Sequence, residues 1–551
     1  MFCYQCEQTL RGTACTDVDK GVCGKTDEVA ALQDLLLHAA KGIAMYAHRA
    51  RALDARDAEI DRFALDALFT TVTNVNFDPA RMADQIREAS TLLTKAKALY
   101  EGACAAAGKE AEKLAGPANW TPADTIDGMA AQGDSISILK RIEELGEDAA
   151  GLQELLTYGL KGVAAYAHHA AVLGHEDEDI YAHVHEALDF TTRTDASVEE
   201  LLAMNLKCGE ISVKVLALLD TANTGTYGHP VPTPVPLGHR EGKCILVSGH
   251  DLKDLEALLQ QTEGKGVDIY THGEMLPAHG YPELKKYAQL YGHFGGAWQN
   301  QRTEFQSFPG PILMTTNCIQ EPRKAYMERI FTSGPVAWPG VTHIADRDYT
   351  AVIDAALADE GFGKDVNAGM HTVGFGHNAV LGLAEPVINA VKAGDIKRFV
   401  LIGGCDGAEG GRNYFTELGE TMPKDWVILT LGCGKFRLVG HDHDYGDIGG
   451  IPRLLDMGQC NDAYSAVRVA MALADAFETD INSLPLSLVL SWYEQKAVCV
   501  LLALLHLGVK NIRIGPKLPA FVTPAVLKVL VDTFNVMPID TVEADLKAMA
   551  A

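Results

Sequence analysis

The sequence contains no apolar run long enough to cross a membrane. A membrane-spanning helix needs ~18 or more consecutive apolar residues. The best candidate, AVCVLLALLHLGV (497–509), is shorter and predicts a buried helix. A secretory signal peptide is also missing, because no apolar core follows the first two cysteines. We therefore predict a cytoplasmic protein that binds no membrane.

Positive charge is scarce as well. The 551 residues include 47 Lys and Arg against 73 Asp and Glu, which gives a formal net charge of -26. Nucleic-acid binding depends on cations that neutralise phosphates, so this composition excludes a nucleic-acid partner. A small neutral or cationic substrate is compatible with it. The length and the 47% hydrophobic content predict a globular protein of several domains.

Cysteine is present in twelve positions, and four of these lie within the first 23 residues. In the cytoplasm thiols stay reduced, so they act as ligands, catalysts or core residues rather than disulfides. Cys3, Cys6, Cys15 and Cys23 are spaced C-x2-C-x8-C-x7-C. Zinc motifs usually have two C-x-x-C pairs and this segment has one, so the spacing favours a [4Fe–4S] cluster over a structural zinc.

An internal repeat fills the first two fifths of the chain. Residues 28–222 have helical periodicity, and LQDLLLHAAKGIAMYAHRA (32–50) matches LQELLTYGLKGVAAYAHHA (152–170) at 11 of 19 positions. The same offset of 120 aligns ALFTTVT (67–73) with ALDFTTR (187–193). We predict two copies of one helical bundle, of which only the first is preceded by the cysteine quartet.

The pattern changes at TANTGTYGHPVPTPVPLGHREG (221–242), where four prolines predict a linker that breaks the helix. Short apolar runs then alternate with helical segments, which is typical of α/β domains with parallel sheets. A second restart near GMHTVGFGHNAVLGL (369–383) indicates two such domains. The predicted domains are residues 1–224, 225–368 and 369–551.

Residues able to bind metal follow the apolar runs of the α/β half. In open α/β sheets, ligands bind beyond the carboxyl ends of the strands, so these residues should meet. Each alone is ordinary, and buried free cysteines are common in cores. We expect Cys104, Cys208, Cys244 and Cys499 to be structural. The predicted ligands are His250, Glu274, Cys318, Cys405, Cys433 and Glu494, with Cys460 in a loop or helix start as a seventh.

These seven residues predict a mixed metal site. Thiolates suit iron–sulfur clusters, whereas imidazole and carboxylates suit a non-haem iron with open positions. One end of the site would therefore resemble an iron–sulfur cluster. The other end would bind a small substrate that carries oxygen or nitrogen.

Specific motifs along the whole chain carry a family resemblance. They are MFCYQC, TANTGTYGHP, SGHDLKDLE, DIYTHGEMLPAH, TTNC, GGCDG, GDIGGIPRLLDMGQCND and SWYEQKAV. The chain resembles the hybrid cluster (prismane) proteins of the hydroxylamine reductase family. The resemblance implies a helical domain of two three-helix bundles, followed by two Rossmann-like α/β domains related to those of carbon monoxide dehydrogenases.

The resemblance also implies two metal centres. The N-terminal quartet matches the ligands of a [4Fe–4S] cluster, although its last spacing of seven residues is longer than usual for such members and a [2Fe–2S] branch exists. The seven residues at strand ends match the ligands of a hybrid [4Fe-2O-2S] cluster. Cys405 matches a thiolate that can carry a persulfide sulfur, and Lys496 matches a lysine beside the cluster.

The implied activity is reduction of hydroxylamine to ammonia and water, with electrons from an external donor protein. Glu494 and Lys496 would deliver protons, and they lie on the same side if the preceding strand extends through them. His250 and Glu274 would hold the reactive iron. The alternative is a nitric oxide reductase or nitrosative-stress protein. A carbon monoxide dehydrogenase-like enzyme and a non-catalytic electron carrier are further alternatives.

Overall fold

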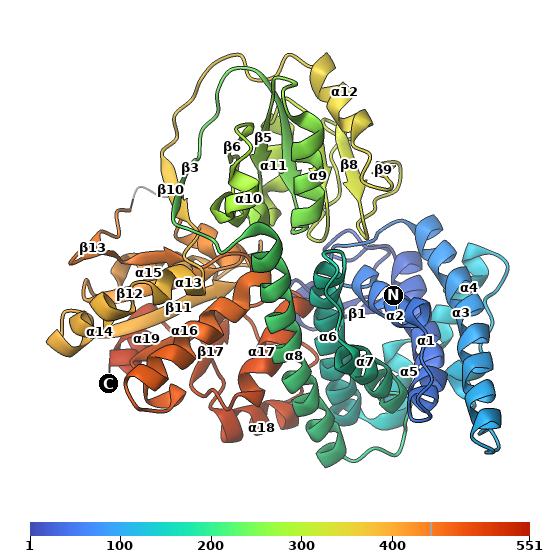
Figure 1. The fold of residues 1–551 in the computed structure, drawn as a ribbon. Coiled ribbons are helices and arrows are strands. Elements are labelled where there is room, and N and C mark those ends of the chain that lie inside the picture. Colours follow the sequence, from blue (N-terminus) through green and yellow to red (C-terminus); the bar gives the residue numbers. More distant parts are fainter. Residues whose placement is uncertain (441–442, 551) are drawn as a thin grey trace.

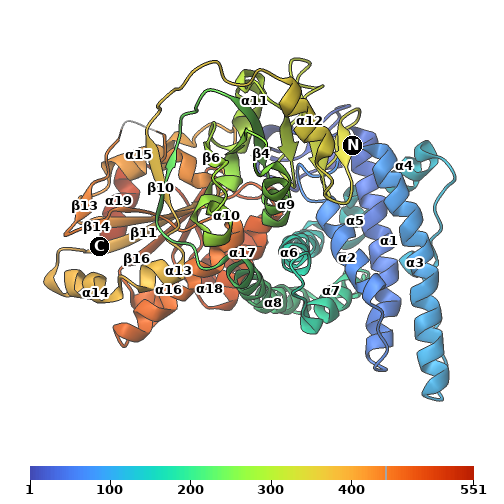
Figure 2. The same ribbon diagram turned by 45° about the horizontal axis from the view of Figure 1, so that its top comes forward.

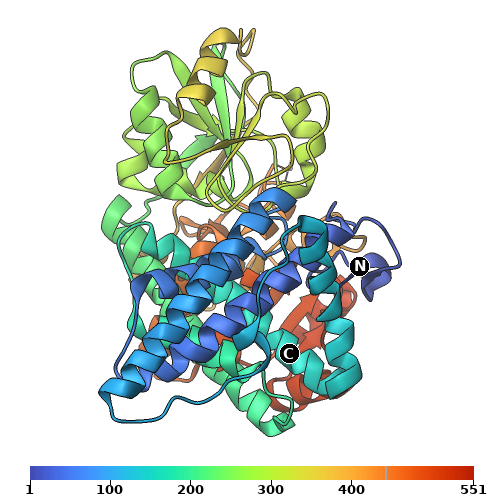
Figure 3. The same cartoon turned by 90° about the vertical axis from the view of Figure 1, so that its right-hand side faces the viewer.

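A computed structural model describes residues 1–440 and 443–550 of the chain. Figure 1 shows three groups of elements: helices in blue to teal, a sheet with helices in green to yellow, and a second sheet with helices in orange to red. The first sheet lies above the other two groups in this view, and the turned views keep the same arrangement (Figures 2 and 3).

The helical group is duplicated, which confirms the predicted repeat. Its first and fourth long helices each have 25 residues, and the helices that follow them each have 13. The first copy consists of α1 (Asp27–Arg51), α2 (Ala58–Thr70) and α3 (Pro79–Ala106), and the second of α6 (Glu147–Ala171), α7 (Glu178–Phe190) and α8 (Val198–Tyr227). Between them lie α4 (Ile126–Ser135) and α5 (Ile138–Leu145).

The two six-stranded sheets are parallel throughout and have the same strand order. In each, the order along the chain is 3-2-1-4-5-6, as in dinucleotide-binding Rossmann folds. The first sheet, in spatial order, is β6 (Leu290–His293), β5 (Val267–Thr271), β4 (Lys243–Ser248), β7 (Ile312–Met314), β8 (Ile330–Ser333) and β9 (Thr342–Ile344). The second is β15 (Leu454–Asp456), β12 (Trp426–Leu431), β11 (Arg398–Gly404), β16 (Leu486–Ser491), β17 (Ile512–Gly515) and β18 (Met537–Pro538). The predicted fold class is confirmed.

Helices and short strand pairs complete the α/β half. The helices are α9 (Leu252–Thr262), α10 (Pro282–Lys285), α11 (Gln301–Ser307), α12 (Thr350–Ala358), α13 (His377–Leu381), α14 (Ala384–Ala393), α15 (Asn413–Thr421), α16 (Ala463–Ala476), α17 (Gln495–His506), α18 (Pro524–Phe534) and α19 (Val542–Ala550). Its antiparallel pairs are β3 (Thr233–Pro236) with β10 (Met370–Val373) and β13 (Asp447–Ile448) with β14 (Ile451–Pro452). A third pair, β1 (Phe2–Cys3) with β2 (Cys15–Thr16), precedes the helical group. None of the helices in the described residues is long and apolar enough to span a membrane.

The predicted linker begins too early. Helix α8 continues through the first seven residues of the predicted break and ends at Tyr227, where Gly228 takes a φ of 80°. The four prolines of the predicted linker all follow Tyr227, so nothing within residues 221–227 forbids a helix. The three-domain division at 224/225 and 368/369 stays a proposal.

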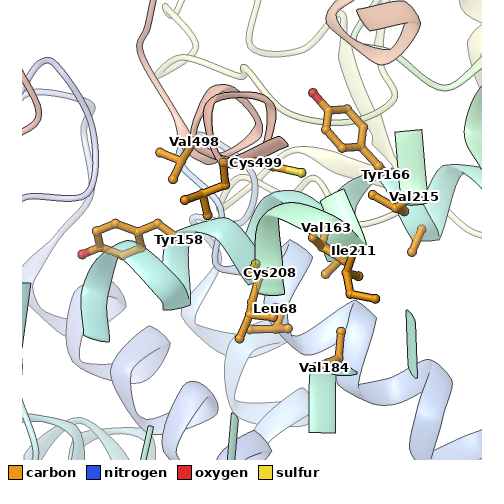
Figure 4. Packing of buried hydrophobic residues seen from close by; sticks show 14 of the residues in the cluster. Leu68, Tyr158, Val163, Tyr166, Val184, Cys208, Ile211, Val215, Val498 and Cys499 are labelled. Carbon is orange, nitrogen blue, oxygen red and sulfur yellow. The ribbon is translucent and has the colours of Figure 1, made fainter. Parts of the chain in front are cut away.

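Helix α17 connects the second sheet to the duplicated helices. It packs against α6 and α8, and Figure 4 shows Val498 and Cys499 of α17 beside Cys208, Ile211 and other residues of this core. Two glycines allow this close approach. A Cβ on Gly162 would lie 2.6 Å from the Gln495 carbonyl oxygen, and one on Gly209 would lie 2.3 Å from the Leu502 carbonyl oxygen. The helix that follows β16 is thereby fixed at its first turn.

Candidate metal centres

All six predicted apolar runs form strands, and each predicted ligand follows the last residue of its strand by one to four positions. The strand order explains why they meet. His250 and Cys318 follow β4 and β7, which flank the switch point of the first sheet, and Cys405 and Glu494 follow the equivalent strands β11 and β16 of the second. Crevices at such switch points are where α/β sheets bind ligands.

One buried cavity of about 20 Å³ collects the complete set. Both sheets contribute to its wall, and Trp298 and Tyr493 close it. The predicted ligands that line it are His250, Glu274, Cys318, Cys405, Cys433, Cys460 and Glu494.

The three ligands that lie close together in this cavity come from both sheets. Ligand atoms of His250, Glu274 and Cys460 all lie within 4.8 Å of one another. Glu274 Oε2 lies 3.8 Å from His250 Nε2 and accepts a hydrogen bond of 2.8 Å from the Cys460 backbone N–H. The other oxygen, Oε1, is buried without a partner. A buried carboxylate oxygen with no donor is costly, and a metal ion held by these three residues would remove that cost.

Thr316 orients the imidazole of His250. Its hydroxyl lies 3.2 Å from His250 Nδ1 and accepts from the His250 backbone N–H at 2.8 Å. Nε2 is left facing Glu274, as expected for a metal-binding histidine whose other nitrogen is held by a neighbouring group. Burial lowers the pKa of His250 well below its usual value, and the nearby Lys496 and His169 lower it further. The ring is therefore neutral and able to bind a metal.

The backbone is strained or closely packed at two of the cysteines. Cys318 has a φ of 128°, a conformation that L residues rarely adopt, and Gln301 Nε2 donates to its carbonyl oxygen at 2.7 Å. A Cβ on Gly404 would lie 2.0 Å from the Ser491 carbonyl oxygen, so only glycine lets β11 and β16 approach here. Such strain persists at functional sites, where the surrounding structure enforces it.

Glu494 and Lys496 are adjacent, but for a different reason from the one predicted. Strand β16 ends at Ser491 and does not extend through them. Glu494 instead caps α17, because its Oε2 accepts from the Lys496 backbone N–H at 2.9 Å. The Lys496 ammonium is buried without a partner. Burial alone would lower the pKa of Lys496, but Cys460 and Glu494 beside it raise the pKa above its usual value.

The N-terminal cysteines form a second group. Cys3 and Cys15 lie opposite each other in the β1–β2 pair. Burial raises the pKa of Cys6 well above its usual value, and the neighbouring Cys23 and Cys3 raise it further. The four thiols are therefore close enough to interact electrostatically.

Two aromatic residues that the sequence analysis did not single out lie between the groups. Trp298 and Tyr493 belong to one buried cluster with Cys6 of the quartet and with Cys318 and Cys433 of the cavity. Their ring centroids are 4.4 Å apart. Tyr493 stands inside the SWYEQKAV motif and was recognisable there, whereas Trp298 follows no strand end.

Comparison with known proteins identifies the family of this chain. The model of the Prismane/CO dehydrogenase family matches residues 1–547. The chain belongs to this family. It is 62% identical over 549 residues to the hydroxylamine reductase of Rhodospirillum rubrum, with 100% of this chain and 99% of the relative covered. It is 57% identical to the hydroxylamine reductase of Syntrophobacter fumaroxidans, with 100% of both covered.

Two solved structures share the fold of this chain at low identity. Carbon monoxide dehydrogenase IV from Carboxydothermus hydrogenoformans matches with a TM-score of 0.56 at 15% identity, covering 97% of this chain and 89% of that one. Carbon monoxide dehydrogenase from Thermococcus sp. AM4 matches with a TM-score of 0.54 at 18% identity, covering 97% and 87%. These likenesses confirm the predicted carbon monoxide dehydrogenase-like fold.

The buried thiols predict a pH dependence for the iron-free protein. Burial raises the pKa of Cys405 to about 12 and that of Cys433 and Cys460 well above the usual value. Unfolded thiols ionise at ~8.5, so this stabilisation is complete below ~8.5 and is lost as the pH rises toward the folded values. We expect the free energy of unfolding to fall as the pH rises from about 8.5 toward about 12, by up to ~1.4 kcal/mol per pH unit and thiol.

Urea titration of the iron-free protein measures this slope. The Cys405→Ser, Cys460→Ser double variant should have a shallower slope than the parent chain. A parent chain whose unfolding free energy is constant over the range would contradict the prediction.

Proposed function

We propose that this chain reduces hydroxylamine to ammonia and water at an iron–sulfur–oxygen centre in the cavity between its two sheets. The observation that carries the proposal is the convergence of seven metal-binding side chains on that one cavity. Relatives named hydroxylamine reductase that are 54–62% identical over the full length support the same activity.

The residues around the cavity fit a mixed centre. Thiolates, an imidazole and carboxylates provide both soft and hard ligands. Glu274 Oε1 and the Lys496 ammonium are both buried without a partner. In a group of iron and bridging anions, the iron would bind the carboxylate and the anions would attract the ammonium. We assign a hybrid [4Fe-2O-2S] cluster to Cys318, Cys405, Cys433, Cys460, His250, Glu274 and Glu494, with Cys405 as the persulfide position. When bound, this group would supply electrons and open iron positions.

We assign a [4Fe–4S] cluster to Cys3, Cys6, Cys15 and Cys23. Its role would be to receive electrons from an external donor protein. The buried cluster of Cys6, Trp298 and Tyr493 supports a short route from this quartet to the cavity. The cytoplasmic location, which was predicted from the lack of a signal peptide and of a membrane-spanning run, belongs to the same proposal.

The side chains can be given roles in the reaction. Hydroxylamine accepts two electrons and two protons, its N–O bond breaks, and ammonia and water leave. Lys496 is a buried ammonium that interacts electrostatically with Glu494 and Glu274, and it would hold a proton at Nζ for the departing oxygen. Glu494, fixed by its cap to α17, would pass a second proton, and His250 and Glu274 would hold the metal.

An apolar cavity of about 120 Å³ favours small neutral substrates. It is lined mainly by Leu, Val, Ala and Ile side chains of the second sheet and α17, and it reaches Cys405, Cys460, Glu494 and Lys496. Hydroxylamine is neutral at pH 7, and nitric oxide is neutral and less polar. The apolar lining therefore supports nitric oxide reduction as the second candidate function.

One assay separates the candidates. The iron-loaded protein is supplied anaerobically with a reductant and either hydroxylamine or nitric oxide, or with an electron acceptor and carbon monoxide, and the products are quantified. We expect one ammonia per hydroxylamine consumed and no carbon monoxide oxidation. Turnover of nitric oxide alone would replace the proposed activity, and reduction of none of them would leave an electron carrier.

Glu494→Gln tests the site itself. The amide keeps the cap on α17 but removes the negative charge and the proton, so turnover should fall by ~100-fold or more. The spectroscopic signal of the N-terminal centre should persist. The exposed Glu385→Gln, in α14, is the matched control and should behave like the parent. Unchanged turnover in Glu494→Gln would show that Glu494 is neither a ligand nor an acid.

A further inference from the structure

Two buried lysines lie beside the N-terminal cysteines. Lys25 is 3% exposed and Lys161 is 4% exposed. Lys161 Nζ donates to Gln5 Oε1 at 3.0 Å and to the Thr71 carbonyl oxygen at 3.3 Å, and Lys25 Nζ donates to Gln33 Oε1 at 2.5 Å. Within the described part of the chain these ammonium groups bond neutral oxygens instead of carboxylates.

The surrounding charges leave positive charge in excess. A cavity of about 20 Å³ is lined by Cys3, Gln5, Lys25, Asp34 and Lys161, and by the Arg141–Glu154 ion pair, whose charges cancel. Asp34 thus remains as one carboxylate against two lysines. A buried cation without a matching anion is strongly unfavourable. Four thiolates holding an iron–sulfur core carry net negative charge, which increases by one on reduction.

The internal repeat provides a natural comparison for Lys161. At the offset of 120, its counterpart in the first copy is Lys41, which is also buried at 6% exposure. Burial lowers the pKa of Lys41 to about 7 and that of Lys161 to about 8. Lys161 lines the cavity with Cys3 and bonds the N-terminal loop, while the cavity wall does not include Lys41. The N-terminal loop that carries the quartet therefore contacts the lysine of the second helical copy.

We propose that Lys161 is the positioning residue that sets the reduction potential of the N-terminal centre. Its buried charge offsets the negative charge that reduction adds, and its hydrogen bond fixes Gln5 between Cys3 and Cys6. Gln5 in turn accepts from Gln495 Nε2 at 2.5 Å through its carbonyl oxygen, next to Glu494. This inference rests on the proposed assignment of an iron–sulfur centre to the quartet.

Redox titration of the iron-loaded protein at pH 7, followed by the spectrum of the N-terminal centre, tests the inference. Lys161→Met should lower the midpoint potential at unchanged iron content. Lys161→Gln, which keeps a donor toward Gln5 and removes only the charge, should do the same, so the test survives if the methionine variant loses iron. Lys161→Arg should restore the potential, and Lys41→Met should shift it much less.

A second measurement uses the iron-free protein. Removing an unmatched buried charge should raise the melting temperature of iron-free Lys161→Met above that of the iron-free parent, opposite to the loss expected from a purely structural lysine. Unchanged potentials in Lys161→Met and Lys161→Gln, or an equal shift in Lys41→Met, would overturn the inference. A parent chain with no iron at the quartet would instead overturn the proposed function.

Discussion

The contact between the N-terminal loop and the turn after β16 is the interaction on which both candidate centres depend. The Glu7 backbone N–H donates to the Tyr493 carbonyl oxygen at 3.0 Å, and Gln495 donates to the Gln5 carbonyl oxygen. Arg412 pairs with Glu7 at 2.9 Å in a fully buried position. Because the same turn supplies Glu494, the quartet cannot move without moving the cavity wall. Two centres separated by hundreds of residues in sequence are therefore held as one unit.

Burial of charge is the cost of this arrangement. Glu274 Oε1 and the Lys496 ammonium are enclosed without partners, and the Lys161 ammonium is enclosed among neutral oxygens. Isolated polar groups of this kind destabilise a fold. Their positions, all beside cysteines, are explained if metal centres supply the missing counter-charges. The same reasoning connects folding to metal loading, since the groups that weaken the empty protein are those that favour the loaded one.

The strand ends were predictable because a parallel sheet brings the carboxyl ends of its strands to one edge. That rule predicted six of the seven cavity residues from the sequence, and Cys460 was added from a predicted loop or helix start. It could not reveal Trp298, which depends on how the two sheets and the N-terminal loop meet, or the proposed role of Lys161, which depends on how that loop packs on the second helical copy. The geometry of Glu494 was predicted for the wrong reason, since the chain turns into α17 three residues after β16. Helix α8 was predicted to end too early, because the predicted break began at residue 221 although all four of its prolines lie beyond Tyr227.

Anomalous diffraction at the iron edge, from crystals of the anaerobically prepared protein, tests the central claim most directly. The account predicts two separate iron-containing positions. One lies among Cys3, Cys6, Cys15 and Cys23, and the other lies in the cavity bounded by His250, Glu274 and Cys433. Iron at only one of these positions, or zinc in place of iron at the quartet, would contradict it.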